Sequence, residues 1–360
     1  MFTLERRVEQ SKSWLALSPI MAIVLTILSG IIIFSVLEKD PWMSLYTFFI
    51  QPLTTGFGVT ELIVKATPLI LIGVGLSIGF KANVWNIGAE GQFTMGAIAG
   101  GGTALFLNTQ ESFFFVLPAV LLMGILGGVV WGMIPAFLKT KFNANEILTS
   151  LMLSYVALLI LSYLVHGPWR DPGGYNFPES EIFSDFAMLP ILLEGTRLNL
   201  GTVFALLSVL IIYILLSRTV LGYQFKVVGL APAAAKHAGF DRAKLIWLSM
   251  IISGGLAGLA GISEVSGTIG QLLPSVSPGY GFTAIIVAFL GRLNPVGVLF
   301  AGLIMALTYI GGENAQIEIG LPAAVTGLFQ GVILFFLLAC DVLARYRLRY
   351  KPFLKARDRE

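Results

Sequence analysis

Long apolar runs separated by short polar stretches dominate the chain, and several runs reach the roughly 20 residues that a helix needs to cross a bilayer. We predict ten membrane segments, at about 15–37, 62–80, 90–107, 113–137, 147–166, 199–217, 244–262, 281–291, 296–312 and 322–340. The eighth is too short for a full crossing. We interpret it as a broken helix, which is tolerated where backbone is buried in protein or lines a cavity.

Composition supports a membrane protein. Of the 360 residues, 56% are hydrophobic and only 12% are charged, whereas a soluble domain carries about twice that charged fraction. A membrane β-barrel would show short alternating segments rather than continuous apolar runs. We therefore predict an all-α polytopic membrane protein in which residues 1–360 form a single transmembrane domain.

Positive charges lie mainly on one side of this arrangement. Ten crossings place both termini on the same side, and 19 of the 23 Lys and Arg then fall on that side. By the positive-inside rule, both termini are cytoplasmic, as are the N-tail 1–14, the loop 218–244 and the C-tail 341–360. The basic C-tail is better explained as an anchor on anionic membrane lipid than as a nucleic-acid site.

Small residues recur at four-residue spacing, which lets membrane helices approach closely. These rows predict a tight bundle and are Gly75/Gly79, Gly96/Gly100, Gly124/Gly128/Gly132 and Gly254/Gly258.

One polar stretch, KANVWNIGAEGQFT from Lys81 to Thr94, interrupts the apolar pattern. It holds the polar candidates Asn83, Asn86, Glu90 and Gln92. Such groups are costly at membrane depth and usually face a cavity or a substrate path, and interrupted hydrophobic segments often mark the binding site of a transporter. The alternative is an ordinary cytoplasmic turn.

A second interruption follows the seventh apolar run and carries Glu264 and Gln271. It continues into GYGFT, beginning at Gly279, which echoes GAEGQFT of the first interruption. Two interrupted segments in corresponding positions predict two diverged repeats of about five spans each.

The loop 218–244 contains a short Ala-rich stretch between Gly229 and Gly239. Pro232 suits the first turn of a helix, and Gly239 suits its C-terminal end. We predict a helix of about two turns that docks into a partner, with an ordinary connector as the alternative.

No catalytic or metal-binding pattern is apparent. Cys340 is the single cysteine, and His166 and His237 have no partner at metal-ligand spacing. No Lys follows a Gly, so the G-x-x-x-x-G-K-[ST] phosphate loop is absent. The sequence predicts a protein that is not an enzyme and binds neither metal nor cofactor; any ATP must be used by another chain.

Over about residues 60–345, the chain resembles permease subunits of bacterial ABC importers for simple sugars, nucleosides and branched-chain amino acids. Asn86 to Gln92 matches the N-I-G-x-E-G-Q motif without a break. Other stretches that resemble the family are Asn145-Glu146 with 149–153, 253–261, and 288–291 with Asn294-Pro295. The stretch 167–172, in a long outer loop, resembles the nucleoside-uptake branch of the family more than its ribose branch.

The loop 218–244 is similar to the coupling loop of that family. Leu230, Ala231 and Phe240 depart from the usual pattern. The resemblance assigns ATPase coupling to Gly229, Pro232, Ala234, Ala235, His237, Ala238 and Gly239.

The resemblance implies an importer for nucleosides in the bacterial inner membrane. A cytoplasmic ABC ATPase, an extracytoplasmic substrate-binding protein and a second, different permease subunit are the implied partners. The candidate substrate path comprises Asn83, Trp85, Asn86, Glu90, Gln92, Phe93, Glu264, Gln271 and Tyr280, with the aromatic side chains suited to a base. The alternatives are a simple-sugar permease, a secondary transporter that needs no ATPase, and a membrane-embedded enzyme.

Overall fold

The computed structural model describes residues 2–6 and 12–350, and within them the regular secondary structure is helical apart from two short strands and one isolated β-bridge. It divides into two compact units, one formed by residues 52–310 and the other by residues 1–51 with 311–360. The boundary near residue 310 falls inside helix α12 (Pro295–Ile319). The helical class is as predicted, while the single domain over 1–360 stays a prediction.

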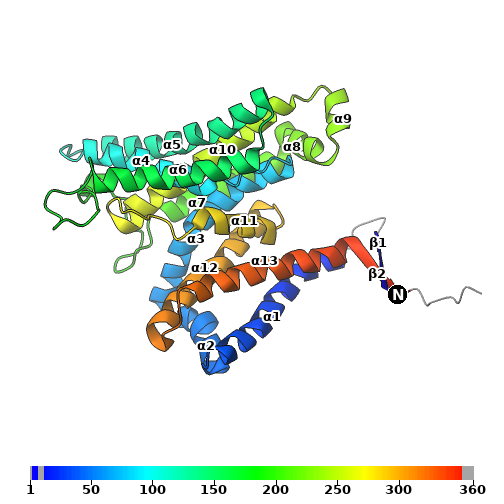
Figure 1. The fold of residues 1–360 in the computed structure, drawn as a ribbon. Coiled ribbons are helices and arrows are strands. Elements are labelled where there is room, and N and C mark those ends of the chain that lie inside the picture. The colour runs from blue at the N-terminus through cyan, green and yellow to red at the C-terminus, as the bar shows by residue number, and fades with distance from the viewer. Residues whose placement is uncertain (1, 7–11, 351–360) are drawn as a thin grey trace, which may run out of the picture. The chain divides into compact units, whose positions relative to one another are not determined.

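The larger unit, residues 52–310, is a helical bundle (Figure 1). Its helices before the long loop are α3 (Gly56–Lys81), α4 (Ala89–Phe106), α5 (Phe113–Phe142) and α6 (Glu146–His166). After the loop come α7 (Gly201–Arg218), α8 (Val220–Leu230), α9 (Pro232–His237), α10 (Arg242–Glu264), the π-helical turn η4 (Val265–Ile269) and α11 (Tyr280–Leu290).

Helices α4, α5 and α10 pack on one another through glycines. A Cβ added at Gly96 would overlap the backbone of Gly258, and one at Gly128 would overlap the carbonyl oxygen of Gly254. A Cβ at Gly258 would in turn meet the backbone of Gly124. Only glycine permits this approach of the helix backbones, so the small-residue rows of the sequence do mark a tight bundle.

The long loop between α6 and α7 is hydrogen-bonded to the chain that follows α10. The Ser180 amide donates to the Leu272 carbonyl at 3.0 Å, and the Leu189 amide donates to the Ser266 carbonyl at 2.9 Å. The loop also contains the 3-10 turn η3 (Asp185–Ala187). These backbone bonds hold it against the second interrupted segment.

The smaller unit packs α1 (Lys12–Val36) against α13 (Ala324–Arg345). Rings of Phe34, Phe48 and Phe329 form the middle of its core, with centroids 4.8 to 6.4 Å apart. The other elements in this region are α2 (Pro41–Leu45), the π-helical turn η1 (Tyr46–Ile50), and the 3-10 turn η2 (Gln51–Leu53), which reaches the boundary between the units.

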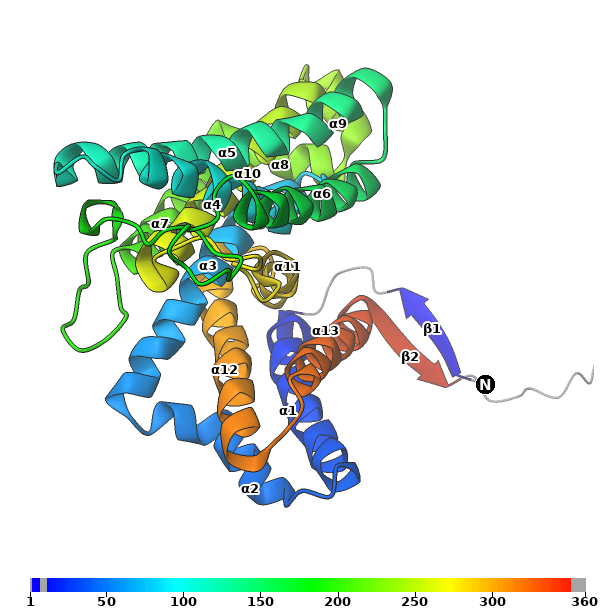
Figure 2. The same ribbon diagram turned by 60° about the vertical axis from the view of Figure 1, so that its left-hand side comes forward.

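The two ends of the chain pair as antiparallel strands, β1 (Phe2–Arg6) and β2 (Tyr346–Tyr350), with Phe2 opposite Tyr350 (Figure 2). The predicted tails 1–14 and 341–360 also contain residues 1, 7–11 and 351–360, which lie outside the described residues. A cytoplasmic position of both tails stays a prediction.

Each of the ten predicted membrane segments falls on a helix. Seven helices of the described chain are long and apolar enough to cross a membrane: Leu17–Val36, Gly56–Lys81, Phe113–Phe142, Glu146–His166, Gly201–Arg218, Arg242–Ile269 and Pro295–Ile319. Helices α4, α11 and α13 are not among these seven, so ten crossings stay a prediction.

The predicted start of one helix lies too far toward the C-terminus. Helix α3 begins at Gly56, six residues before the expected 62. The side chain of Thr55 caps it by accepting from the Gly58 amide at 3.0 Å. Within this first part of the helix, the Arg197 guanidinium pairs with the Glu61 carboxylate.

Candidate functional site: a buried joint between two interrupted segments

Helix α4 begins inside the protein, and neighbouring side chains satisfy its first backbone donors. The Gly88 amide donates to Asn86 Oδ1 at 3.1 Å. From α6, Ser150 Oγ accepts from the Ile87 amide and Ser154 Oγ accepts from the Gly91 amide, both at 3.2 Å. Because a helix N-terminus leaves several amides without an intrahelical partner, these bonds let α4 start away from water.

Asn86 and Gln92 form a reciprocal pair of side-chain amides. Asn86 Nδ2 donates to Gln92 Oε1 at 2.8 Å, and Gln92 Nε2 donates to Asn86 Oδ1 at 3.1 Å. Asn86 Nδ2 also donates to Ser253 Oγ on α10 at 2.9 Å. The exposed fractions of Asn86 and Gln92 are 2% and 1%, so protein groups replace water around both amides.

Glu90 links the two interrupted segments. Its carboxylate is 2% exposed, and Oε2 accepts from the Gly281 amide at 2.6 Å. The Ser277 hydroxyl hydrogen-bonds the same carboxylate. Because Gly281 lies in the first turn of α11, the Glu90 carboxyl group sits at the N-terminus of that helix, where its oxygen satisfies an orphan amide.

We call Asn86, Glu90, Gln92, Ser253 and Gly281 the joint. A Cβ added at Gly281 would overlap the backbone of Glu90, so α11 reaches the start of α4 only because this residue is glycine. The joint lies within the bundle and is not a free turn.

The aromatic candidates divide into two environments. Phe93 and Tyr280 are fully buried and pack edge to face, with ring centroids 6.1 Å apart. Trp85 stacks on Phe289 at 5.8 Å, and its Nε1 donates to Asn83 Oδ1 at 3.0 Å. Asn83 is exposed, and Trp85 is half-buried. Asn83 and Trp85 therefore offer the accessible surface in this set.

Glu264 and Gln271 have contacts that do not involve the joint. Glu264 lines a cavity of about 10 Å³ beside Thr67, Asn199 and Ser263. Gln271 Nε2 donates to Glu179 Oε2 in the long loop at 2.9 Å. The cavity and this hydrogen bond both lie beside the long loop, which contains Asn199 and Glu179.

Residues 219–243 form a second candidate site, the coupling segment, which comprises α8, α9 and the start of α10. As predicted, α9 starts at Pro232, and Gly239 has a positive φ of 75° just beyond its end. Ala234, His237 and Ala238 are exposed, whereas Ala235 is buried. A cavity of about 530 Å³ lies beside α9 and is lined by Val228, Pro232, Ala233, Ala235, Lys236, Phe240, Asp241, Arg242 and Ala243.

The coupling segment contacts the chain that leads into the joint. Gly229 in α8 lies against the end of α3, where an added Cβ would overlap the carbonyl oxygen of Lys81. Val84 follows three residues later and donates its amide to the Gly79 carbonyl at 2.8 Å. Only a short length of backbone therefore separates the Gly229 contact from Asn86.

The sequence did not single out the serines that bond to Asn86 and to the amides at the start of α4. Ser150 and Ser154 lie four residues apart on α6, and Ser253 lies on α10. Hydroxyls at helical spacing in an apolar helix were the available signal, because such groups bond across helices in a membrane. Within the described residues, no three His, Cys, Asp or Glu gather as metal ligands.

Buried polar side chains joining broken helices in an apolar bundle are typical of multi-pass membrane transport proteins. Residues 58–338 match the family described as branched-chain amino acid transport system, permease component, and the chain belongs to this family. It is therefore a multi-pass transport subunit of the cell membrane and not an enzyme, and membership of this ABC permease family implies that a partner ATPase uses the ATP.

Named relatives match nearly the whole chain. A glucose ABC transporter permease protein of Haloferax volcanii is 37% identical, covering 93% of this chain and 90% of the relative. A guanosine ABC transporter permease protein of Bacillus subtilis is 31% identical, covering 93% and 94%. A nucleoside ABC transporter permease protein of Lactococcus lactis is 28% identical, covering 91% and 92%.

Proposed function

We propose that the chain forms part of the translocation path of an ATP-driven nucleoside importer and receives its driving motion through the coupling segment. The observation that carries the coupling is the contact of Gly229 with the Lys81 carbonyl. A displacement of α9 by a docked ATPase moves α8, and α8 cannot move toward α3 without displacing the chain that enters the joint. A second, different permease and an extracytoplasmic binding protein complete the proposed importer.

In this proposal, Asn86, Glu90 and Gln92 are positioning residues. Their polar atoms bond to protein groups, so they hold α4, α10 and α11 in register rather than meeting the substrate directly. Trp85 and Asn83, which are the more accessible, offer a ring face and an amide at the same end of α3. A base stacks on such a ring, and a ribose hydroxyl bonds to such an amide.

Glucose or a related sugar is the second candidate substrate, because the Haloferax volcanii relative is a glucose permease. Nucleosides are favoured by the guanosine and nucleoside permeases among the relatives. A secondary transporter is disfavoured, because the relatives are permeases of ABC transporters.

The substrate is tested by uptake in cells that carry the complete importer. Radiolabelled guanosine is supplied with an excess of unlabelled adenosine, glucose or ribose. We expect adenosine to compete and glucose not to compete, and we expect deletion of this chain to abolish uptake. Glucose accumulation that depends on this chain, without guanosine accumulation, would assign the sugar function instead.

A further inference from the structure

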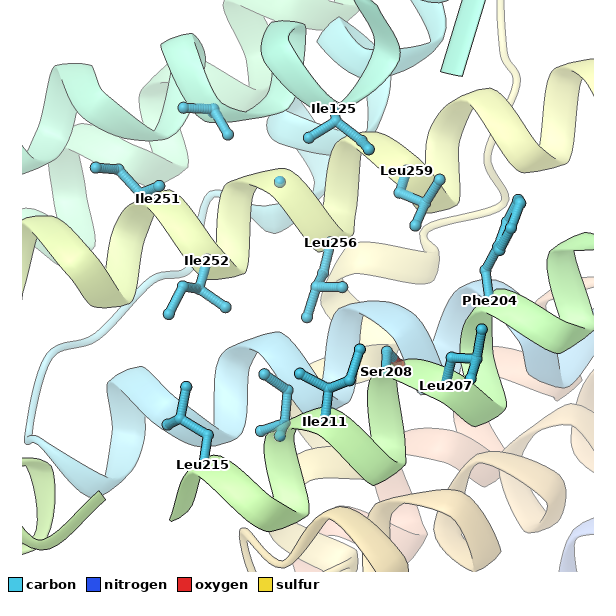
Figure 3. A pocket seen from close by; sticks show the side chains of 13 residues that line it. Ile125, Phe204, Leu207, Ser208, Ile211, Leu215, Ile251, Ile252, Leu256 and Leu259 are labelled. Carbon is cyan, nitrogen blue, oxygen red and sulfur yellow. The ribbon is translucent and has the colours of Figure 1, made fainter. Parts of the chain in front are cut away.

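An apolar groove runs between α5, α7 and α10 (Figure 3). Its volume is about 580 Å³, and its walls include Ile125, Leu207, Ile211, Ile252 and Leu256. Ser208 is the one hydroxyl residue of the lining, and its Oγ donates to the Ala205 carbonyl of its own helix at 2.7 Å. The groove therefore offers a ligand no free hydrogen-bonding group from its side chains.

The dimensions of the groove fit one hydrocarbon chain. Along α7 the lining runs from Phe204 to Leu215, which is about 16 Å at 1.5 Å per residue. That length is about half of a 30 Å hydrocarbon core, or the depth of one leaflet. The volume holds on the order of 15–20 groups of the size of water, which suits the carbons of one fatty-acyl chain.

Two cations lie beyond the same end of the groove. In Figure 3, Leu215 of α7 and Ile251 of α10 mark that end, whereas Phe204 and Leu259 mark the other. Arg218 follows Ile211 by seven residues, and Lys244 precedes Ile251 by seven, so each cation lies two turns beyond a lining residue on the same helix face. Both side chains are exposed, and no ion pair joins either one to another described residue.

We propose that this groove binds an anionic phospholipid, with one acyl chain between α5, α7 and α10 and the phosphate near Arg218 and Lys244. All three helices are among those able to cross a membrane, so hydrocarbon rather than water surrounds the groove. The charge at one end selects the headgroup and fixes the direction of the lipid. This inference needs only the membrane position of the chain and not the proposed substrate.

Lipid retention tests the site. The importer is purified in mild detergent, supplied with phosphatidylglycerol or with phosphatidylcholine of the same chains, and weighed by native mass spectrometry. We expect about one tightly held phosphatidylglycerol per chain and about a tenfold preference over phosphatidylcholine, because each nearby cation contributes about fivefold at most.

Two variants, each with a control, distinguish binding of the acyl chain from recognition of the headgroup. Leu256→Trp fills the groove and should remove the retained lipid, whereas Leu159→Trp adds the same bulk on an open face of α6 (Leu159 is 70% exposed) and should not. Arg218→Gln with Lys244→Gln should remove the preference for phosphatidylglycerol, and Arg170→Gln in the long loop should leave it unchanged.

Three results would overturn the site. They are equal retention by wild type and Leu256→Trp, an unchanged headgroup preference in the double Gln variant, and loss of the second permease from the Leu256→Trp importer without loss of lipid. The last would show that a protein helix covers the groove. Thermal unfolding of each variant distinguishes these outcomes from misfolding, since a folded variant keeps the wild-type transition.

Discussion

Glu90 is a carboxylate inside an apolar bundle, and its partners explain how it is tolerated there. The Gly281 amide donates to it at 2.6 Å, and the Ser277 hydroxyl bonds it as well. A buried charged or polar group without partners costs several kcal/mol, roughly, whereas one bonded to a helix N-terminus is stabilised. In the structure, Glu90 therefore bonds the start of α4 to the start of α11.

The effect of a substitution at Glu90 should therefore depend on whether the new side chain can still accept a hydrogen bond. Glu90→Gln keeps an oxygen that accepts from Gly281 and should be mild for folding and uptake. Glu90→Leu leaves the Gly281 amide and the Ser277 hydroxyl without this acceptor, at a cost of about 1–3 kcal/mol for each buried group. Protein yield and thermal unfolding in detergent measure the difference, with the exposed Glu194→Leu as the control. Loss of uptake in a well-folded Glu90→Gln would instead indicate direct substrate contact.

Substitutions of Asn86 and Gln92 should have non-additive effects on the free energy of unfolding. Because each amide is the partner of the other, removing either one already breaks their shared bonds. Asn86→Ala with Gln92→Ala should destabilise the protein by about 1 kcal/mol less than the sum of the single variants. Asn86→Ala with Glu194→Ala should be additive within about 0.5 kcal/mol. Strict additivity in the first cycle would contradict the paired geometry.

At the scale of elements, the apolar pattern predicted where the helices lie and which regions interrupt them. It missed α8, because polar Tyr223, Gln224 and Lys226 made the stretch resemble a loop. It also missed the helical turns at 41–50 in the smaller unit. Both depend on packing against neighbours, which periodicity along a single chain does not encode.

The two interruptions were predicted from their glycines and polar residues, but their mutual contact was not. Glu90 and Gly281 are 191 positions apart, and nothing in either stretch specifies the other as its partner. The sequence likewise suggested Phe93 and Tyr280 as ligand contacts, whereas their rings pack inside the unit. Burial is a property of the assembled bundle, so residue type alone did not separate these two from Trp85.

The close contact between Gly229 of the coupling segment and the Lys81 carbonyl can be tested by substitution. Gly229→Val places a branched side chain against the Lys81 carbonyl and should abolish ATP-dependent uptake while membrane insertion persists. Gly239→Ala should be milder, because no atom lies within 4 Å of its added Cβ and only the positive φ opposes it, at about 1–2 kcal/mol. Gly327→Val, at a helical glycine with open space around it, is the matched control. Equal uptake by Gly229→Val and Gly327→Val would contradict the coupling contact.

The whole chain belongs to a permease family and carries no phosphate-binding loop. As a permease subunit it supplies the membrane part of a transporter, and a partner ATPase uses the ATP. Strands β1 and β2 pair, so residues 2–6 lie beside residues 346–350. The sequence predicted the membrane class because composition and apolar run length report it directly, whereas the substrate depends on side-chain placement in a complete importer.

Reconstitution tests the account most directly. The permeases of the importer are placed in liposomes with binding protein and labelled guanosine, with ATP supplied on the ATPase side, and accumulation is measured with and without the partner ATPase. We predict accumulation only when the ATPase is present, and none when Gly229→Val replaces the wild-type chain although the ATPase is bound. ATP-dependent accumulation by the permeases without the ATPase, or full accumulation with Gly229→Val, would contradict the claim that a partner drives this chain through its coupling segment.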